Sequence, residues 1–142
     1  MELVVDEPQI HWRAAADAVA AAVNEAETLG IRINAAVVDK GGNLLAFQRM
    51  NGAFLHSIGI AIDKAYTAAG FGFPTGQWMD EIRDLPQLRE GIVHRERLVI
   101  FGGGLPIVVD DAVVGAIGVS GGSETQDERC ARAGLQRLGV AD

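Results

Sequence analysis

Tight turns between short β-branched runs constrain the fold of this chain more than any other feature. The run Ile31–Val38 is followed by an Asp-Lys-Gly-Gly-Asn turn and then by a second run, Leu44–Arg49. Asp, Asn and Gly at adjacent positions are typical of hairpin turns, because glycine adopts positive φ without steric cost. A second pair of runs, 105–109 and 112–119, is joined by an Asp-Asp turn. Hairpins pair strands antiparallel, so the sequence favours an antiparallel sheet over a doubly wound parallel one.

Helical periodicity and stop signals place helices at both ends of the chain. We predict a helix over Gln9–Leu29, which is rich in alanine and is followed by a glycine that can end it. A closing helix is predicted over 123–138. Ser123 and Gln126 have the spacing of a capping box, and Gly139 follows as its C-terminal stop.

The middle of the chain is less regular. Ser57 is suited to cap a helix that runs to about Ala69 and stops at Gly70, and its many small residues allow close packing on a sheet. Over 71–96, prolines and glycines interrupt the pattern, so we expect short helical turns at most. The run Leu98–Phe101 predicts a further strand, which brings the expected number to five. An irregular segment this long in a small domain is often functional.

The length and the apolar content indicate one α/β domain of the α+β type over residues 1–142. The chain has 142 residues, of which 49% are hydrophobic, and only 6% are aromatic. This length is the commonest one for a single domain. Its core is therefore expected to consist mainly of Ala, Val, Ile and Leu.

Charge and cysteine content exclude several classes of protein. The net charge is −7, with no basic stripe for phosphates and no attraction to an anionic membrane surface. Cys130 is the only cysteine, which excludes an internal disulfide and a multi-cysteine zinc site. Neither a signal peptide nor an apolar run long enough to span a bilayer is present, so we expect a cytoplasmic protein.

Two glycine-rich segments are candidate binding elements. The first, Gly118–Ser123, lies between a predicted strand and a capped helix, where free backbone N–H groups can bind an anion. The alternative is an ordinary strand-to-helix turn. The second, Gly102–Gly104, matches neither a phosphate-binding loop nor a dinucleotide fingerprint. It predicts either a pocket wall or a β-bulge.

Lys64 and Arg49 are candidate ligands for an anion. Lys64 lies in the middle of the small-residue helix, and Arg49 ends the strand that precedes this helix. The two cations can therefore converge on one anionic ligand. A lysine drawn into a pocket can also act as a base or form a Schiff base. The alternative for Lys64 is a solvated position on the helix surface.

The histidines are scattered at positions 11, 56 and 94, without the spacing of a metal-binding pair. Each is expected at the surface or beside a site. Haem needs only one axial side chain, so this pattern does not exclude haem. Cys130 lies among alanines and a leucine and is expected to be buried.

Spaced motifs over most of the chain resemble the GlcG/HbpS-like family, which includes haem-binding members and the PduO C-terminal-type domain. Such an ordered series is far more specific than any single glycine loop. The matching stretches are 36–42, 49–53, 64–68, 102–107, 114–121 and 126–128.

The resemblance implies a profilin-like domain with a five-stranded antiparallel sheet flanked by helices. It also implies homo-oligomers and, in some members, the binding of haem or corrinoid-related ligands. Other members accompany catabolic enzymes in operons. One departure is Asn51, where the family usually has Asp, since Asn cannot act as a carboxylate base. By its placement in the first helix, His11 is the candidate axial ligand of haem.

We therefore interpret the chain as a small-ligand-binding protein that holds haem or another carboxylate-bearing metabolite in a homo-oligomer, without nucleic acid or membrane partners. The alternative is a small catabolic isomerase, tautomerase, hydratase or lyase acting on an oxo- or hydroxy-acid, with Lys64 as the catalytic residue and glycine N–H groups as oxyanion donors. A purely structural role ranks third. The predicted ligand-binding residues are Arg49, Asn51, Lys64, Thr67, Gly102, Gly103, Gly104, Ser120 and Gly121.

Overall fold

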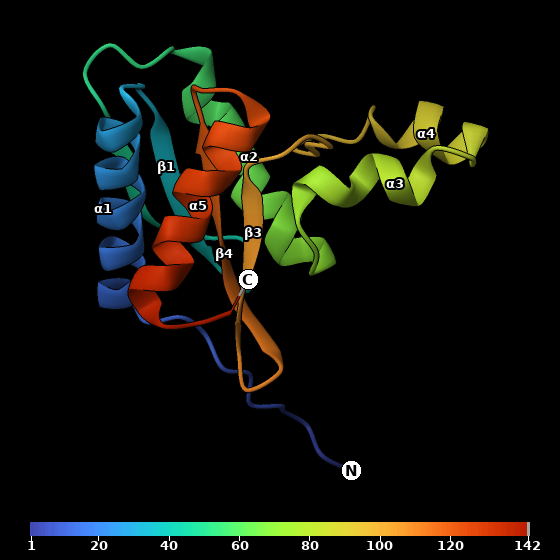
Figure 1. Cartoon of the computed structure of the whole chain (residues 1–142). Helices are drawn as coiled ribbons and strands as arrows, with labels where there is room; N and C mark the ends of the chain where they lie inside the picture. Colours follow the sequence, from blue (N-terminus) through green and yellow to red (C-terminus); the bar gives the residue numbers. More distant parts are fainter. Residues whose placement is uncertain (142) are drawn as a thin grey trace.

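The computed structural model describes residues 1–141 as a helix-flanked sheet with a projecting helical arm (Figure 1). The helices are α1 (Trp12–Leu29), α2 (His56–Phe71), the 3₁₀ turn η1 (Thr75–Gln77), α3 (Trp78–Ile82), α4 (Pro86–Ile92) and α5 (Glu124–Leu138). The strands are β1 (Asn34–Asp39), β2 (Leu44–Arg49), β3 (Gly104–Val109) and β4 (Ala112–Ser120).

The sheet has the order β2-β1-β4-β3, and every neighbouring pair is antiparallel. The helices α1 and α5 pack together on one face, and α2 covers the other (Figure 1). The predicted antiparallel sheet flanked by helices is therefore confirmed. Both predicted hairpins are present, and Asp110 and Asp111 adopt the positive φ that a tight two-residue turn requires.

The two faces of the sheet differ in the size of their side chains. Ile117 and Val119 belong to the main core beneath α1 and α5. On the opposite face of β4, a Cβ at Gly118 would overlap the carbonyl oxygen of Ala61. The absence of a side chain at Gly118 thus lets the backbone of α2 lie directly on β4, as the small residues of this helix predict.

The prediction of a fifth strand is wrong. Leu98–Phe101 pairs with no strand among the described residues, because its backbone is held by a side chain. The Thr67 hydroxyl accepts a hydrogen bond from Val99 N at 3.1 Å and donates one to Arg97 O at 2.9 Å. Arg97 itself has a φ of 64°, a turn conformation that ends extended backbone.

The helix boundaries follow local hydrogen bonds. The first helix begins at Trp12, later than predicted, because the His11 side chain accepts a hydrogen bond from Arg13 N and so serves as its cap. The predicted Ser57 cap is wrong, since the cap position is Leu55, two residues earlier, and has no side-chain hydrogen bond. The helix α2 begins at His56 and extends to Phe71. The predicted capping box of Ser123 and Gln126 is confirmed.

The irregular segment contains only short helices, as expected from its prolines and glycines. Together α3 and α4 form an arm that projects from the sheet (Figure 1). Within residues 1–141 no helix is both long and apolar enough to cross a membrane. No group of three or more His, Cys, Asp or Glu residues is arranged to hold a metal ion in this part of the chain.

Candidate functional site

A groove of about 790 Å³ lies between α1 and the edge strand β2. Its volume lies within the range of about 300–1,000 Å³ that small-molecule sites usually have. It is lined by Ala16, Val19, Ala20, Val23, Asn24, Glu27, Arg32, Leu45, Ala46, Phe47, Gln48, Arg49, Met50 and Asn51.

The groove combines an apolar wall with a cationic end. The helix α1 contributes small and branched apolar side chains such as Ala20 and Val23. Arg49 ends β2 and is the direct cross-strand partner of Asn34 at the start of β1. Arg32 precedes Asn34 by two residues, so the two arginines lie at the same end of the groove. Glu27 of α1 also lines the groove, so its two arginines outnumber its one carboxylate. Such an arrangement suits a ligand with an apolar body and a carboxylate end.

Only part of the Arg49 guanidinium is hydrogen-bonded within the described part of the chain. Its Nη2 donates a hydrogen bond to Ala53 O at 2.8 Å, which fixes the side chain against the loop that leads to α2. Its Nε is buried and has no partner within the described part of the chain. Any hydrogen bond from Arg49 to a ligand in the groove would therefore come from its other guanidinium N–H groups and not from the buried Nε.

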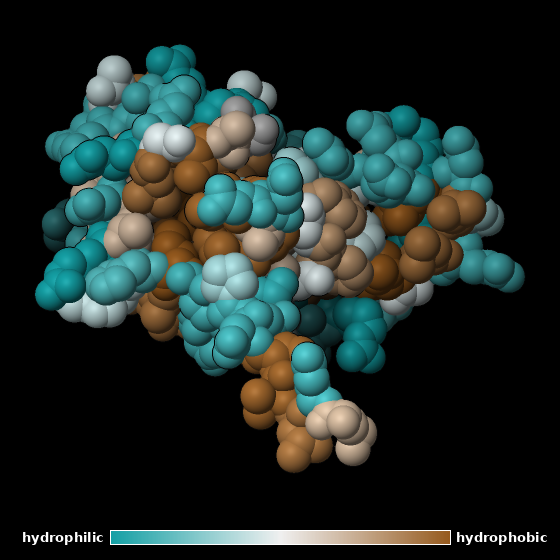
Figure 2. Space-filling view, turned by 90° about the horizontal axis from the view of Figure 1, so that it is seen from below, coloured by the Kyte–Doolittle hydropathy of each residue, from teal (hydrophilic) through white to brown (hydrophobic). Residues whose placement is uncertain are grey.

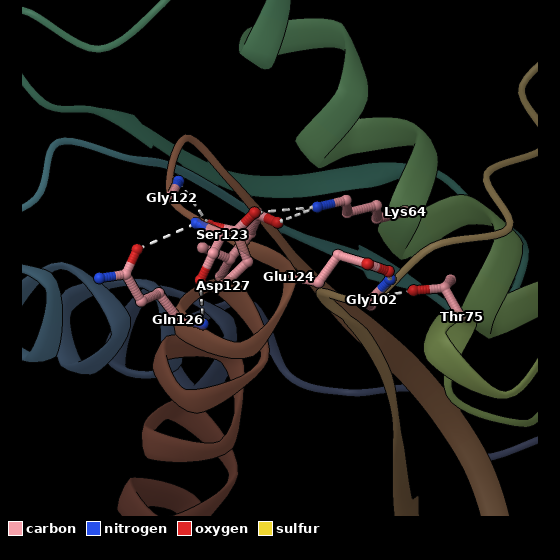
Figure 3. Close-up of polar contacts among 10 residues, drawn as sticks. Lys64, Thr75, Gly102, Gly122, Ser123, Glu124, Gln126 and Asp127 are labelled. Atoms are coloured by element: carbon pink, nitrogen blue, oxygen red, sulfur yellow. Dashed lines mark hydrogen bonds and ion pairs between the residues drawn. The ribbon is translucent and has the colours of Figure 1, made fainter.

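Lys64 forms the most deeply buried ion pair of the described residues, and it lies outside the groove. Its Nζ donates to Asp127 Oδ2 at 3.1 Å and to Val119 O at 2.8 Å (Figure 3). The Phe101 ring lies 5.2 Å from the same nitrogen, within cation–π range. Only 1% of Lys64 is exposed, and burial lowers the pKa of its amine against the attraction of Asp127. Burial likewise raises the pKa of the Asp127 carboxyl.

The backbone N–H groups that we predicted to bind an anion are already hydrogen-bonded to side chains of α5. Asp127 Oδ1 accepts from Gly122 N at 2.8 Å, and Gln126 Oε1 accepts from Ser123 N at 2.9 Å (Figure 3). A carboxylate of the chain itself thus fills the site at the start of α5, where the helix dipole favours negative charge.

The second glycine segment is held in the same way. Gly102 N donates to Glu124 Oε1 at 2.7 Å, and Gly104 N donates to Thr75 Oγ1 at 2.9 Å (Figure 3). Gly103 has a φ of +128°, and a Cβ there would lie 2.6 Å from Lys64 Nζ. The glycines therefore make room for the buried lysine.

A family model described as haem degrading protein HbpS-like matches residues 10–136, which is most of the chain. This match decides the family. The chain belongs to the HbpS-like family. The resemblance predicted from the spaced motifs is thereby confirmed.

Three relatives extend this HbpS-like assignment. A 15.0 kDa protein of the dhaT-dhaS intergenic region of Citrobacter freundii is 42% identical over 125 residues, 86% of this chain and 87% of the relative. The crystal structure of Klebsiella pneumoniae protein ORFY superposes with a TM-score of 0.90 at 32% identity, over 100% and 99% of the two chains. A crystal structure of a PduOC:heme complex has a TM-score of 0.85 at 28% identity, over 94% and 97%.

In this HbpS-like chain only some of the predicted ligand-binding residues line the groove. Arg49 and Asn51 line the groove, whereas Lys64 and Gly102–Gly104 do not. Thr67 uses its hydroxyl to hold the segment after α4. Ser120 is buried at the end of β4, and Gly121 lies against Arg32 O. His11 is exposed at the start of α1 and is absent from the groove lining.

Sequence reasoning missed Arg32, Met50 and Asp127. Arg32 carries no motif, and Met50 lies in the family-like stretch 49–53 without a signal of its own for ligand binding. Only the β1–β2 register brings the two residues to one end of the groove. Asp127 stands in the first turn of α5, where a carboxylate is ordinary. Its pairing with Lys64, 63 positions earlier, is a tertiary contact.

Proposed function

We propose that this protein binds haem or another anionic, carboxylate-bearing small molecule in the groove between α1 and β2. The observation that carries the proposal is the groove itself, which has small apolar side chains of α1 along one wall and Arg32 and Arg49 at one end. An apolar ring system would lie along α1, and its carboxylates would lie at the edge of β2 where Arg32 and Arg49 line the groove. The haem complex of the structurally similar PduOC domain supports this choice of ligand.

The residues of the groove fit the body and the carboxylates of haem better than they fit its iron. Haem iron is usually held by His, Cys, Met or Tyr. Met50 is the one residue of these types in the groove lining, and its sulfur accepts a hydrogen bond from Ile33 N at 3.3 Å. When bound, haem would supply redox chemistry at its iron. The chain itself supplies burial of the ring and the charges that neutralise its carboxylates.

His11 remains our predicted axial ligand of haem, on the basis of the family resemblance. Its hydrogen bond in the apo-protein restricts how it could bind the iron. Its Nδ1 accepts the capping hydrogen bond from Arg13 N at 3.0 Å. A neutral imidazole carries one proton, which then sits on Nε2. Ligation of iron through Nε2 therefore requires His11 to give up its cap of α1.

The alternative, an enzyme acting on an oxo- or hydroxy-acid with Lys64 as base or electrophile, requires this amine to reach a substrate. The lowered pKa of Lys64 favours such a role. Its near-complete burial and its ion pair with Asp127 oppose the role. We therefore retain ligand binding as the leading proposal.

We also propose that the chain forms a homo-oligomer through the projecting arm. Met79, Leu85, Leu88 and Val93 expose between 37% and 50% of their surface there. Figure 2 shows hydrophobic side chains gathered on this arm, at the right of the view. Exposed apolar patches of this kind mark interaction surfaces, and an arm carrying charges of both signs suits a symmetric partner.

The proposed function is tested by titrating hemin into the apo-protein, with the Soret band and native mass spectrometry as readouts. The expected result is saturable, stoichiometric binding that weakens at least about tenfold when Arg32 and Arg49 are both replaced by Met. His11→Ala and Met50→Leu identify the axial ligand from the shift of the Soret band. Arg83→Met, at the exposed residue that follows α3, is the matched control. Hemin binding that is unsaturable, or unchanged in the double variant, would reject the groove.

A further inference from the structure

The edge strand β2 presents free backbone hydrogen-bonding groups on one side. The sheet has the order β2-β1-β4-β3, so among the described strands β2 pairs with β1 alone. Met50 N donates to Ile33 O at 3.0 Å, and the antiparallel alternation therefore turns the backbone groups of Gln48 toward β1. The backbone groups of Phe47 and Arg49 then face the open edge. The side chain of Gln48 agrees with this direction, since its Nε2 donates to Arg49 O at 3.1 Å.

The groove between α1 and β2 runs along this open edge. Successive residues of a strand point to opposite faces of the sheet, yet all residues from Leu45 to Arg49 line the groove. A space that touches consecutive residues must follow the edge of the strand. On α1 the facing wall has small side chains such as Ala16 and Ala20. The groove of about 790 Å³ therefore has room for an extended chain beside β2.

The start of the chain is an apolar segment with nothing to pack against. Leu3, Val4 and Val5 expose 84%, 80% and 80% of their surface. Every residue from 1 to 9 is exposed, and Figure 1 shows this end of the chain leading away from the rest of the molecule. Valines favour extended backbone, and Pro8 limits the length of a strand here. We call residues 2–7 the N-terminal segment.

The charges of the N-terminal segment complement those around β2. Its three apolar residues are flanked by Glu2 on one side and by the acidic pair 6–7 on the other. At the groove, Arg32 and Arg49 lie beside the end of β2, and Lys40 precedes its start. An acidic-apolar-acidic segment thus matches a strand edge with basic residues near both ends. Complementary charges of this kind favour one register over others.

The N-terminal segment leaves the molecule on the side of the sheet opposite to β2. Pro8 lines a small apolar hollow together with Val109, which belongs to the other edge strand, β3. Ile10 N is held by Val114 O of β4 at 3.0 Å. Before this anchor the chain points away from the sheet (Figure 1). A second copy can therefore offer its β2 edge to the segment without any reversal of the chain.

We propose that the N-terminal segment of one copy adds as a short strand to the open edge of β2 in a second copy. Its backbone bonds to the free groups of Phe47 and Arg49, and alternate side chains face the α1 wall of the groove. Six residues bury less than the roughly 1,200 Å² of a stable interface, so this contact supplements the proposed contact through the arm. The inference goes beyond the proposed function and does not require haem, although both occupants would use the same groove.

Disulfide trapping between full-length chains tests this proposal. Chains carrying Val4→Cys or Val5→Cys are mixed with tagged chains carrying Gln48→Cys, an exposed groove position, under mild oxidation. A disulfide requires Cα atoms within about 7 Å, and neighbouring residues of a strand face opposite ways. One of the two segment variants is therefore expected to form the mixed dimer at least about tenfold faster than the other. The native Cys130 is buried and present in every sample.

The control partner carries Gln136→Cys, at an exposed position of α5 away from the groove. Mixed dimers that form equally fast with Gln48→Cys and Gln136→Cys, or equally fast from both segment variants, would show random collision and overturn the proposal. A disulfide that forms only within one chain, in Val4→Cys/Gln48→Cys or Val5→Cys/Gln48→Cys, would overturn it as well.

Hemin separates this inference from the proposed function. Trapping is measured first without hemin, so its outcome does not depend on haem binding. Selective trapping in a protein that binds no hemin would support strand addition and reject the haem proposal. Hemin binding without selective trapping would do the reverse. If both occur, saturating hemin should slow the trapping, because the two occupants share the groove.

Discussion

Lys64 and Asp127 hold three elements together at the scale of single residues. The amine extends from α2 to the carbonyl of Val119 at the end of β4 and to the carboxylate in the first turn of α5. Both side chains are almost fully buried. Removing one partner leaves the other charge unpaired in a poorly solvated place, which costs more than the pair contributes.

Lys64→Met is therefore expected to lower the free energy of unfolding by about 3–5 kcal/mol. The double variant Lys64→Met/Asp127→Leu should lose less than Lys64→Met alone, because no buried charge is left without a partner. Urea denaturation of the wild type, both single variants and the double variant measures this cycle. Additive losses would show that the two side chains do not interact.

Cys130 offers a second prediction at the residue scale. Burial raises the pKa of its thiol to about 12 from 9.0. The thiolate is the reactive form, so a raised pKa lowers reactivity at every pH below it. At pH 8 we expect the native protein to react with a disulfide reagent at least about tenfold more slowly than the urea-unfolded chain. Equal rates in the two states would contradict the burial of this thiol.

At the scale of elements, the closest contact is that between α2 and β4. A Cβ at Gly118 would overlap the carbonyl oxygen of Ala61, and backbone cannot move aside cheaply. Gly118→Ala should therefore destabilise the fold by about 3 kcal/mol. Gly59→Ala on the same helix is the control. It meets no atom within 4 Å and should stabilise α2 by about 0.5–1 kcal/mol. Thermal unfolding of both variants measures these changes in stability. Equal changes in the two variants would refute close packing as the reason for a glycine at position 118.

Elements bounded by local signals were predictable from the sequence. The end of α1 at Gly30, the capping box of α5 and the Asp110-Asp111 hairpin all depend on residues within a few positions of one another. The segment 98–101 was not predictable, because its hydrogen-bonding partner, Thr67, lies about 30 positions earlier. Hydrophobic pattern alone cannot separate a strand from a segment held by a side chain.

The candidate site was only partly predictable for the same reason. Arg49 and Asn51 were identified from sequence and do line the groove, but the groove itself depends on how α1 crosses β2. The placement of Asn34 between Arg49 and Ser120 likewise depends on the register of three strands. Neither relation leaves a local signal in a single sequence.

At the scale of the whole molecule, the projecting arm predicts self-association. Leu88→Glu places a charge on its apolar surface and should reduce the mass measured by light scattering to that of one chain, because burying an unpaired carboxylate is unfavourable. Glu81→Gln, at an exposed position of α3, is the control and should keep the wild-type mass. A Leu88→Glu variant of unchanged mass would exclude the arm as the interface.

The measurement that tests the central claim most directly is hemin titration of a variant whose groove is filled. Ala20 is an exposed residue of α1 in the groove lining, and Ala20→Trp places a large side chain there. Gln136→Trp adds the same side chain to an exposed position of α5, away from the groove. If the groove is the binding site, Ala20→Trp abolishes the Soret shift at unchanged thermal stability, and Gln136→Trp retains it. A Soret shift that survives in Ala20→Trp would contradict the claim.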